Sequence, residues 1–135
     1  IGTDMNAWPT VKHFTSWLGL APKNYISGGR VLRSRTIPLK NRATQAFRMA
    51  AHSVIRSDSA LGAFYRRLRG RIGPHQALVA TAHKIARIVY YMLRDHVPFR
   101  ETTAEAYEAK YREQRLKRLQ RQAAKLGYTL TAIEN

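Results

Sequence analysis

The residues best suited to chemistry in this sequence form one short run, Ser27-Gly28-Gly29-Arg30. A serine hydroxyl acts as a nucleophile when it is exposed and surrounded by groups that stabilise developing charge. The two glycines allow the backbone to approach a partner closely, and the arginines at 30, 33 and 35 suit a phosphoryl group. The run therefore permits attack of Ser27 on a phosphodiester, although Ser-Gly-Gly is also typical of an ordinary turn.

Basic residues are concentrated around this run and are abundant elsewhere. The 135 residues include 24 Lys and Arg against 8 Asp and Glu, a formal net charge of +16. A polyanion relieves the self-repulsion of such a domain, and released counterions favour phosphate binding. We therefore expect nucleic acid as the partner, ahead of a membrane surface or a solvated basic face. The residues expected to contact it are Gly28, Gly29, Arg30, Arg33, Arg35, Lys40, Asn41, Arg42, Arg48 and Lys84.

The acids and histidines do not form a recognisable metal site. The eight carboxylates fall mainly at expected helix starts or on the last helix, where dipole and i,i+4 effects account for them. No two histidines have the spacing of a zinc protease, and the absence of cysteine excludes disulfides, thiolate zinc sites and cysteine nucleophiles. We expect no metal ligand and no cofactor in this chain. No apolar run approaches a membrane span, and no signal-peptide pattern is present.

Helical periodicity dominates the rest of the chain. Helices are expected after Pro9-Thr10, over about 41–55, after the turn at 57–59 as far as Gly73, and from there to about residue 96. A basic loop, with a short extended piece near 31–32, is expected over 21–38. Thr102 and Glu105 form a capping box before a fifth helix, which is basic, carries only a thin apolar stripe and ends at Gly127.

These elements predict an all-α fold. Residues 1–98 are expected to form a compact domain of about four helices with a basic Ser-Gly-Gly loop. Residues 99–135 are expected to form a long, basic, amphipathic C-terminal helix. The first residues are Ile-Gly rather than Met, so we expect the chain to be a fragment of a longer protein.

Six short motifs carry a resemblance to a known family. They are WLGLAP at 17–22, SGG at 27–29, KNR at 40–42, FRMAA at 47–51, ALGAF at 60–64 and AHKIAR at 82–87. In this order they resemble the C-terminal transposase domain of the DEDD (RuvC-like) insertion-sequence transposases. That family includes the Piv-type invertases and the bridge-RNA-guided recombinases. The resemblance covers about residues 1–95.

The resemblance implies that Ser27 is a nucleophile that forms a covalent phosphoserine link with DNA. It also implies a RuvC-like domain upstream, whose acidic tetrad binds Mg²⁺, and an element-encoded guide RNA that pairs with the DNA. Without that domain, we expect this fragment to bind nucleic acid but not to cut it. The full protein is expected to be a homo-oligomeric transposase in the bacterial cytoplasm, associated with the nucleoid.

Two alternatives stay open. In the first, the chain is a binding module without catalytic activity, Ser27 is a turn residue, and the basic surface only holds DNA or RNA. In the second, the C-terminal helix is an oligomerisation element that joins chains through its apolar stripe.

Overall fold

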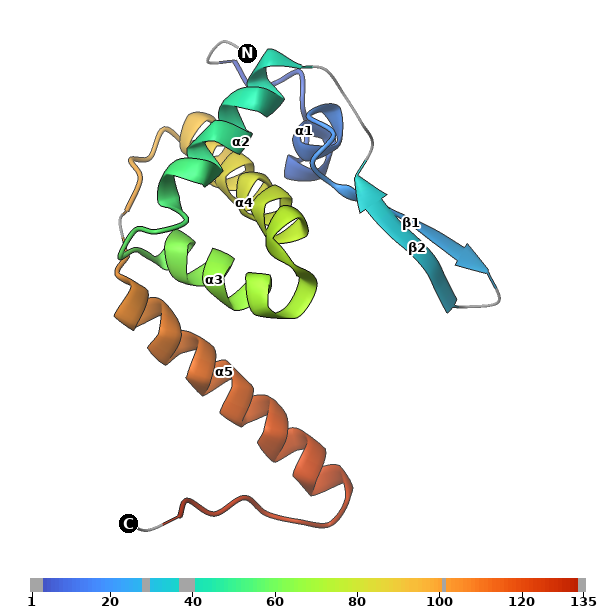
Figure 1. The fold of residues 1–135 in the computed structure, drawn as a ribbon, viewed down its shortest axis with the longest axis vertical. Helices are drawn as coiled ribbons and strands as arrows, with labels where there is room; N and C mark the ends of the chain where they lie inside the picture. The colour runs from blue at the N-terminus through green and yellow to red at the C-terminus, as the bar shows by residue number, and fades with distance from the viewer. Residues whose placement is uncertain (1–3, 28–29, 37–40, 101, 134–135) are drawn as a thin grey trace.

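The structure is a computed structural model that describes residues 4–27, 30–36, 41–100 and 102–133, with only the backbone over 22–27 and 30–36. Helices form the body of the molecule, as the sequence predicts, and a two-stranded sheet is added to them (Figure 1). The elements are α1 (Val11–Trp17), β1 (Pro22–Ser27), β2 (Arg30–Thr36), α2 (Arg42–Val54), α3 (Ala60–Ile72), α4 (Pro74–Asp95) and α5 (Ala104–Lys125).

The segment expected to be a basic loop is instead a β hairpin that projects from the helices (Figure 1). β1 and β2 pair in antiparallel orientation, from Pro22 opposite Thr36 to Ser27 opposite Arg30. The register shifts after Tyr25, because Tyr25 pairs with Arg33 but Ile26 pairs with Val31, so β2 carries one extra residue there. Both strands are rich in polar and basic residues, which hides the alternation by which strands are usually predicted.

The long helix α4 lies at the centre of the domain and packs against α1, α2 and α3. Small buried residues on α4, Ala77, Ala82 and Ala86, leave room for the side chains of its neighbours. Phe14 of α1 is fully buried, with its ring centroid 6.2 Å from Phe47 and 5.6 Å from Tyr90. The core contains Met5, Phe14, Leu18, Leu20, Phe47, Ala51, Val79, Ala82, Ala86 and Tyr90.

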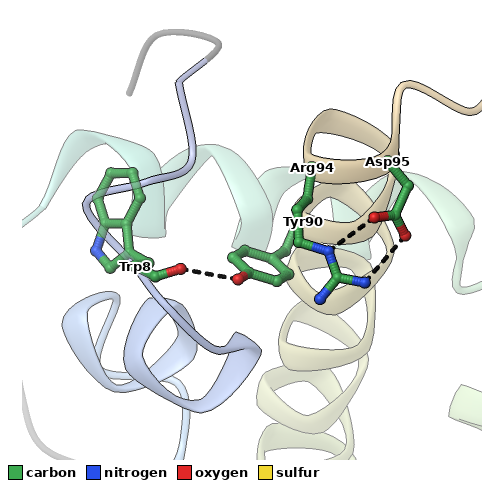
Figure 2. A network of polar contacts seen from close by, with 4 residues as sticks. All are labelled: Trp8, Tyr90, Arg94 and Asp95. Carbon is green, nitrogen blue, oxygen red and sulfur yellow. Dashed lines mark hydrogen bonds and ion pairs between the residues drawn. The ribbon is translucent and has the colours of Figure 1, made fainter.

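Two long-range hydrogen bonds hold the segments on either side of the hairpin. The hydroxyl of Tyr90 donates to the carbonyl of Trp8 over 2.8 Å (Figure 2). The hydroxyl of Thr44, which is buried, donates to the carbonyl of Leu18 over 2.6 Å. Leu18 precedes the hairpin and Thr44 follows it, so this bond joins the two chain segments from which the hairpin leaves the core.

Polar side chains cap most of the helices. Thr10, Asn41 and Ser59 accept hydrogen bonds from backbone amides in the first turns of α1, α2 and α3. The cap of α5 is Thr103 rather than the predicted Thr102, since the Thr103 hydroxyl accepts from the amide of Ala106. Thr102 has another role, because its carbonyl accepts a 2.8 Å hydrogen bond from the amide at the start of α3. The chain therefore enters α5 one residue later than the capping-box pattern indicates.

The last helix is poorly buried, as its thin apolar stripe predicts. α5 packs on α3, and Tyr107 and Tyr111 near its start are partly covered. None of its residues is buried, and Leu116 and Leu119 are exposed. Gly127, at φ +83°, follows the helix end at Leu126, where the sequence predicts the stop. None of the described helices has both the length and the apolar character needed to cross a membrane.

Candidate nucleic-acid interface

The hairpin places the predicted nucleophile beside an arginine. Ser27 and Arg30 form the last residue pair of the antiparallel ladder. Opposite residues in such a ladder have Cα atoms about 4.5 to 5.5 Å apart. The predicted contacts Gly28 and Gly29 stand between them and lie outside the described residues. Ser27 is thus the last residue of β1, at the far end of the projecting hairpin (Figure 1).

Further predicted contacts follow along β2 and into α2. Arg33 pairs with Tyr25 and Arg35 pairs with Lys23, so one strand carries three of the expected arginines. Lys40 lies outside the described residues. The remaining candidates in this region, Asn41, Arg42 and Arg48, belong to the cap and the body of α2.

The three α2 candidates differ in what the fold requires of them. Asn41 caps the helix, with its side-chain oxygen accepting a 2.9 Å hydrogen bond from the amide of Ala43. Arg42, the first residue of α2, is exposed and free to meet a ligand. Arg48 is partly buried, and its Nε has no hydrogen-bond partner among the described residues. The Asn41 oxygen therefore already has a structural role. Its position directly before the first residue of α2 is typical of an N-cap and could have indicated this role from the sequence.

Lys84, the last predicted contact, lies outside the hairpin. It lies on α4, half-buried, with Nζ 4.5 Å from the ring centroid of Phe64 on α3. Burial, and then the positive charges of Arg87, Arg67 and Lys110, lower the pKa of Lys84. Arg87, Arg67 and Lys110 are not among the predicted contacts. They lie on three different helices, so the proximity of all three to Lys84 cannot be predicted from local sequence.

Part of the arginine excess serves the fold. The guanidinium of Arg66 donates to the carbonyls of Ile55 and Ser57, at 3.1 and 3.0 Å, and so closes the turn between α2 and α3. Arg67 donates from Nε to the hydroxyl of Tyr107 over 3.0 Å and joins α3 to α5. Arg94 makes a bidentate ion pair with Asp95 (Figure 2). Charge counting alone therefore does not identify which arginines also have hydrogen-bonding roles within the fold.

Histidines and carboxylates do not gather around the hairpin. In the part of the chain that the structure describes, no three of these side chains come together in a way that would hold a metal ion. His83 is half-buried on α4, and burial, followed by the charge of Arg87, lowers its pKa. The surroundings of this histidine thus disfavour its protonated form.

The fold and the site define a class of protein, a basic helical domain that displays a serine and an arginine at the end of a hairpin. Residues 1–66 match the model of the family described as Transposase IS116/IS110/IS902 family. The match covers just under half of the chain and agrees with the resemblance that the motifs indicate. The match contains α1, the hairpin, α2 and the first half of α3. A search of curated proteins and a search of solved structures each found no match.

Proposed function

We propose that this chain is the DNA-binding part of a transposase and that it supplies Ser27 as the nucleophile for strand cleavage and rejoining. The observation that carries the proposal is the pairing of Ser27 with Arg30 at the far end of the hairpin. The hairpin lies within the stretch that matches the transposase family, and the chain has a net charge of +16. A serine in a projecting basic hairpin is accessible to a phosphodiester, and a neighbouring guanidinium stabilises the charge that develops on the phosphoryl oxygens.

The proposed chemistry is a transesterification. The Oγ of Ser27 attacks phosphorus, a new P–O bond forms, and the bond from phosphorus to the leaving sugar oxygen breaks. The hydroxyl proton of Ser27 passes, through a base or solvent, to that oxygen. In the reverse step a sugar hydroxyl of the new partner strand attacks the phosphoserine and releases Ser27. One phosphodiester is exchanged for another, so rejoining needs no separate energy source.

Nucleic-acid binding is assigned to the basic residues near the nucleophile. Arg30, Arg33 and Arg35 on β2, with the exposed Arg42, are proposed to contact phosphates. A guide RNA that pairs with the DNA would supply sequence choice, while this surface holds backbone and shape. The metal-dependent part of the reaction is proposed for a RuvC-like domain with Mg²⁺ on another part of the protein. Residues 1–98 would then act as the nucleophile-bearing unit, and this chain by itself would bind without cutting.

The nucleophile is tested by Ser27→Ala in the transposase that contains this chain. Recombination is expected to fall by at least about a thousandfold, while the Kd for DNA changes by less than about twofold. The matched control is Ser34→Ala, the same change in the opposite strand of the hairpin, where Ser34 pairs with Asn24. It should retain activity. If the Ser27→Ala protein still recombines DNA, Ser27 is not the nucleophile and the chain is a binding module.

The binding surface is tested by replacing Arg30, Arg33 and Arg35 with Ala together. DNA affinity should fall, and the slope of log Kd against log salt should become shallower by about 0.9 for each phosphate that is no longer neutralised. An unchanged slope would remove the hairpin from the interface. The Ser34→Ala protein again serves as the control, since it alters the hairpin without changing its charge.

One observation favours a second role, in self-association. On α5 the exposed Leu116 and Leu119, which are 47% and 41% exposed, continue with Ala123 and Leu126 at 3-4-3 spacing. Sedimentation of the chain should reveal a dimer that Leu116→Ser/Leu119→Ser converts to a monomer. Met49→Ser, at an exposed apolar residue of α2, should leave the dimer intact. A wild-type chain that is monomeric at high concentration would exclude this role.

A further inference from the structure

Four cations from three helices form a second basic surface, distinct from the hairpin. They are Arg67 of α3, Lys84 and Arg87 of α4, and Lys110 of α5, and we call them the three-helix cation cluster. Arg87 lies about one turn beyond Lys84 on α4. Lys110 lies about one turn beyond Tyr107, whose hydroxyl accepts from Arg67. The three helices contribute residues that are far apart in the sequence, so tertiary packing brings the cluster together.

Aromatic rings hold two members of the cluster in place. The ring of Phe64 contacts both cations. Nζ of Lys84 lies 4.5 Å and the guanidinium carbon of Arg67 lies 5.8 Å from its centroid. The Arg67 guanidinium also lies 4.0 Å from the ring centroid of Tyr111. Cation–π contacts of this kind stabilise a cation without neutralising it. The positive charges of Lys84 and Arg67 are therefore fixed in position without being neutralised.

None of these four cations forms an ion pair with a carboxylate in the described part of the chain. The charged groups that act on Lys84 are Arg87, Arg67 and Lys110, and each of them opposes its protonation. The ion pairs found in the described residues, Arg94 with Asp95 and Lys117 with Glu113, involve other positions. Neighbouring like charges destabilise a fold unless an external anion compensates them. The arrangement thus has the properties of a surface that contacts an anion.

We propose that the three-helix cation cluster contacts the phosphate backbone of nucleic acid, as a second contact region besides the hairpin. An extended polyanion fits better than a single phosphate, because the basic surface continues along α5. That helix is about 33 Å long, and its exposed cations beyond the cluster are Arg112, Arg115, Lys117, Arg118, Arg121 and Lys125. The inference rests on the proposed function, since it takes nucleic acid as the partner, but it assigns part of the affinity to residues outside the hairpin.

The test uses the whole chain and two matched pairs of substitutions. Arg87→Gln/Lys110→Gln removes two exposed cations of the cluster that make no hydrogen bond or ion pair among the described residues. The control, Lys12→Gln/Arg56→Gln, removes one exposed Lys and one exposed Arg away from the cluster and so changes the net charge equally. Binding to a random-sequence DNA duplex is followed by fluorescence anisotropy at several salt concentrations, and thermal melting checks that each variant is folded.

The cluster pair should weaken binding by about tenfold or more and reduce the salt slope by about 2, since each neutralised phosphate contributes about 0.9. The control pair should change the slope by less than about 0.5. Equal effects from both pairs would overturn the inference, because binding would then depend only on net charge. A wild-type chain that does not bind the duplex would instead overturn the proposed function itself.

A second experiment measures the pKa of Lys84 in the wild-type chain, without any substitution. The pKa of Lys84 is followed by NMR of its Cε, first free and then with saturating duplex. A phosphate at the cluster should raise this pKa, because it offsets the cations that now lower it. The same measurement on Lys12, which is exposed on α1 and lies outside the cluster and α5, provides the comparison. A Lys84 pKa that does not move when the duplex binds would overturn the inference.

Discussion

The hydroxyl of Tyr90 donates a 2.8 Å hydrogen bond to the carbonyl oxygen of Trp8, so the central helix holds the segment that leads into α1 (Figure 2). Tyr90 is 1% exposed, and a hydroxyl buried this deeply needs a partner. The Trp8 ring in turn lies 5.2 Å from Phe14 and 5.0 Å from Trp17. This contact supports α1, the helix from which the chain enters the hairpin.

Tyr90→Phe is expected to lower the free energy of unfolding by about 1 to 2 kcal/mol, because it leaves the Trp8 carbonyl without its protein donor. Thermal or denaturant unfolding measures the change. Tyr91→Phe is the matched control, since the neighbouring Tyr91 hydroxyl makes no hydrogen bond within the described residues, and it should cost less than about 0.5 kcal/mol. Equal losses in the two variants would contradict the structural role of the Tyr90–Trp8 bond.

Gly62→Ala is expected to destabilise the domain by about 2 to 3 kcal/mol. A Cβ at Gly62 would lie 2.8 Å from the carbonyl oxygen of Val54 and closer still to that of Ser57, and neither backbone atom can move easily. Gly70→Ala in the same helix is the control, because nothing lies within 4 Å of a Cβ there. That variant should gain about 0.5 to 1 kcal/mol from better helix propensity. Chemical denaturation of both variants measures their free energies of unfolding, which should fall for Gly62→Ala and rise for Gly70→Ala.

Thr103→Ala is expected to fray the start of α5 at a cost of about 1 kcal/mol, since the Ala106 amide loses its capping oxygen. Faster hydrogen exchange at that amide is the measurement. Thr102→Ala should have little effect there, because the contact that Thr102 makes with Ala60 uses its backbone carbonyl. If Thr102→Ala accelerated exchange at the Ala106 amide more than Thr103→Ala does, Thr102 would be the cap instead.

Stability is expected to fall with acidification in a way that depends partly on His83. Burial, then Arg87, lower the folded-state pKa of His83 below its usual value of about 6.5. The unfolded chain therefore binds the proton more readily, so this stabilising contribution is present above about pH 6.5 and is lost as the pH falls. Melting curves between about pH 7.5 and 5 should show a smaller loss of Tm for His83→Gln than for the wild type.

The exposed His52 in the last turn of α2 provides the comparison for this titration. His52→Gln removes an imidazole from an exposed position, and this variant is expected to lose Tm with acidification as the wild type does. If His83→Gln and the wild type lose Tm in parallel, His83 does not contribute to the acid sensitivity of the fold.

Much of the helical framework could be predicted because its signals are local. Thr10 and Ser59 cap helices where the sequence indicates, and Gly127 follows the end of α5. Each signal depends on a few neighbouring residues and on their hydrogen bonds to adjacent amides. The one-residue difference between Thr102 and Thr103 arises because the backbone of Thr102 is used in a contact with α3.

The hairpin was less predictable because its pairing is a relation between two segments. The polar strands lack the alternation that marks a half-buried sheet, so residues 21–38 resemble a loop. Only the pairing places Ser27 opposite Arg30 and Arg33 opposite Tyr25. The sequence singled out Ser27 and its arginines by residue type and family motifs, while the register set which of them are neighbours.

The sequence by itself determined the basic charge, the helical framework and the similarity of the first 66 residues to a transposase family, because composition and short motifs carry that information. It also selected Lys84 as a nucleic-acid contact, in one list with residues of the expected basic loop. Only the tertiary structure decided that Lys84 lies over Phe64 beside Arg67, Arg87 and Lys110. The physical reason is that cations on three helices become neighbours only when those helices pack, and the packing depends on how side chains of distant segments fit together.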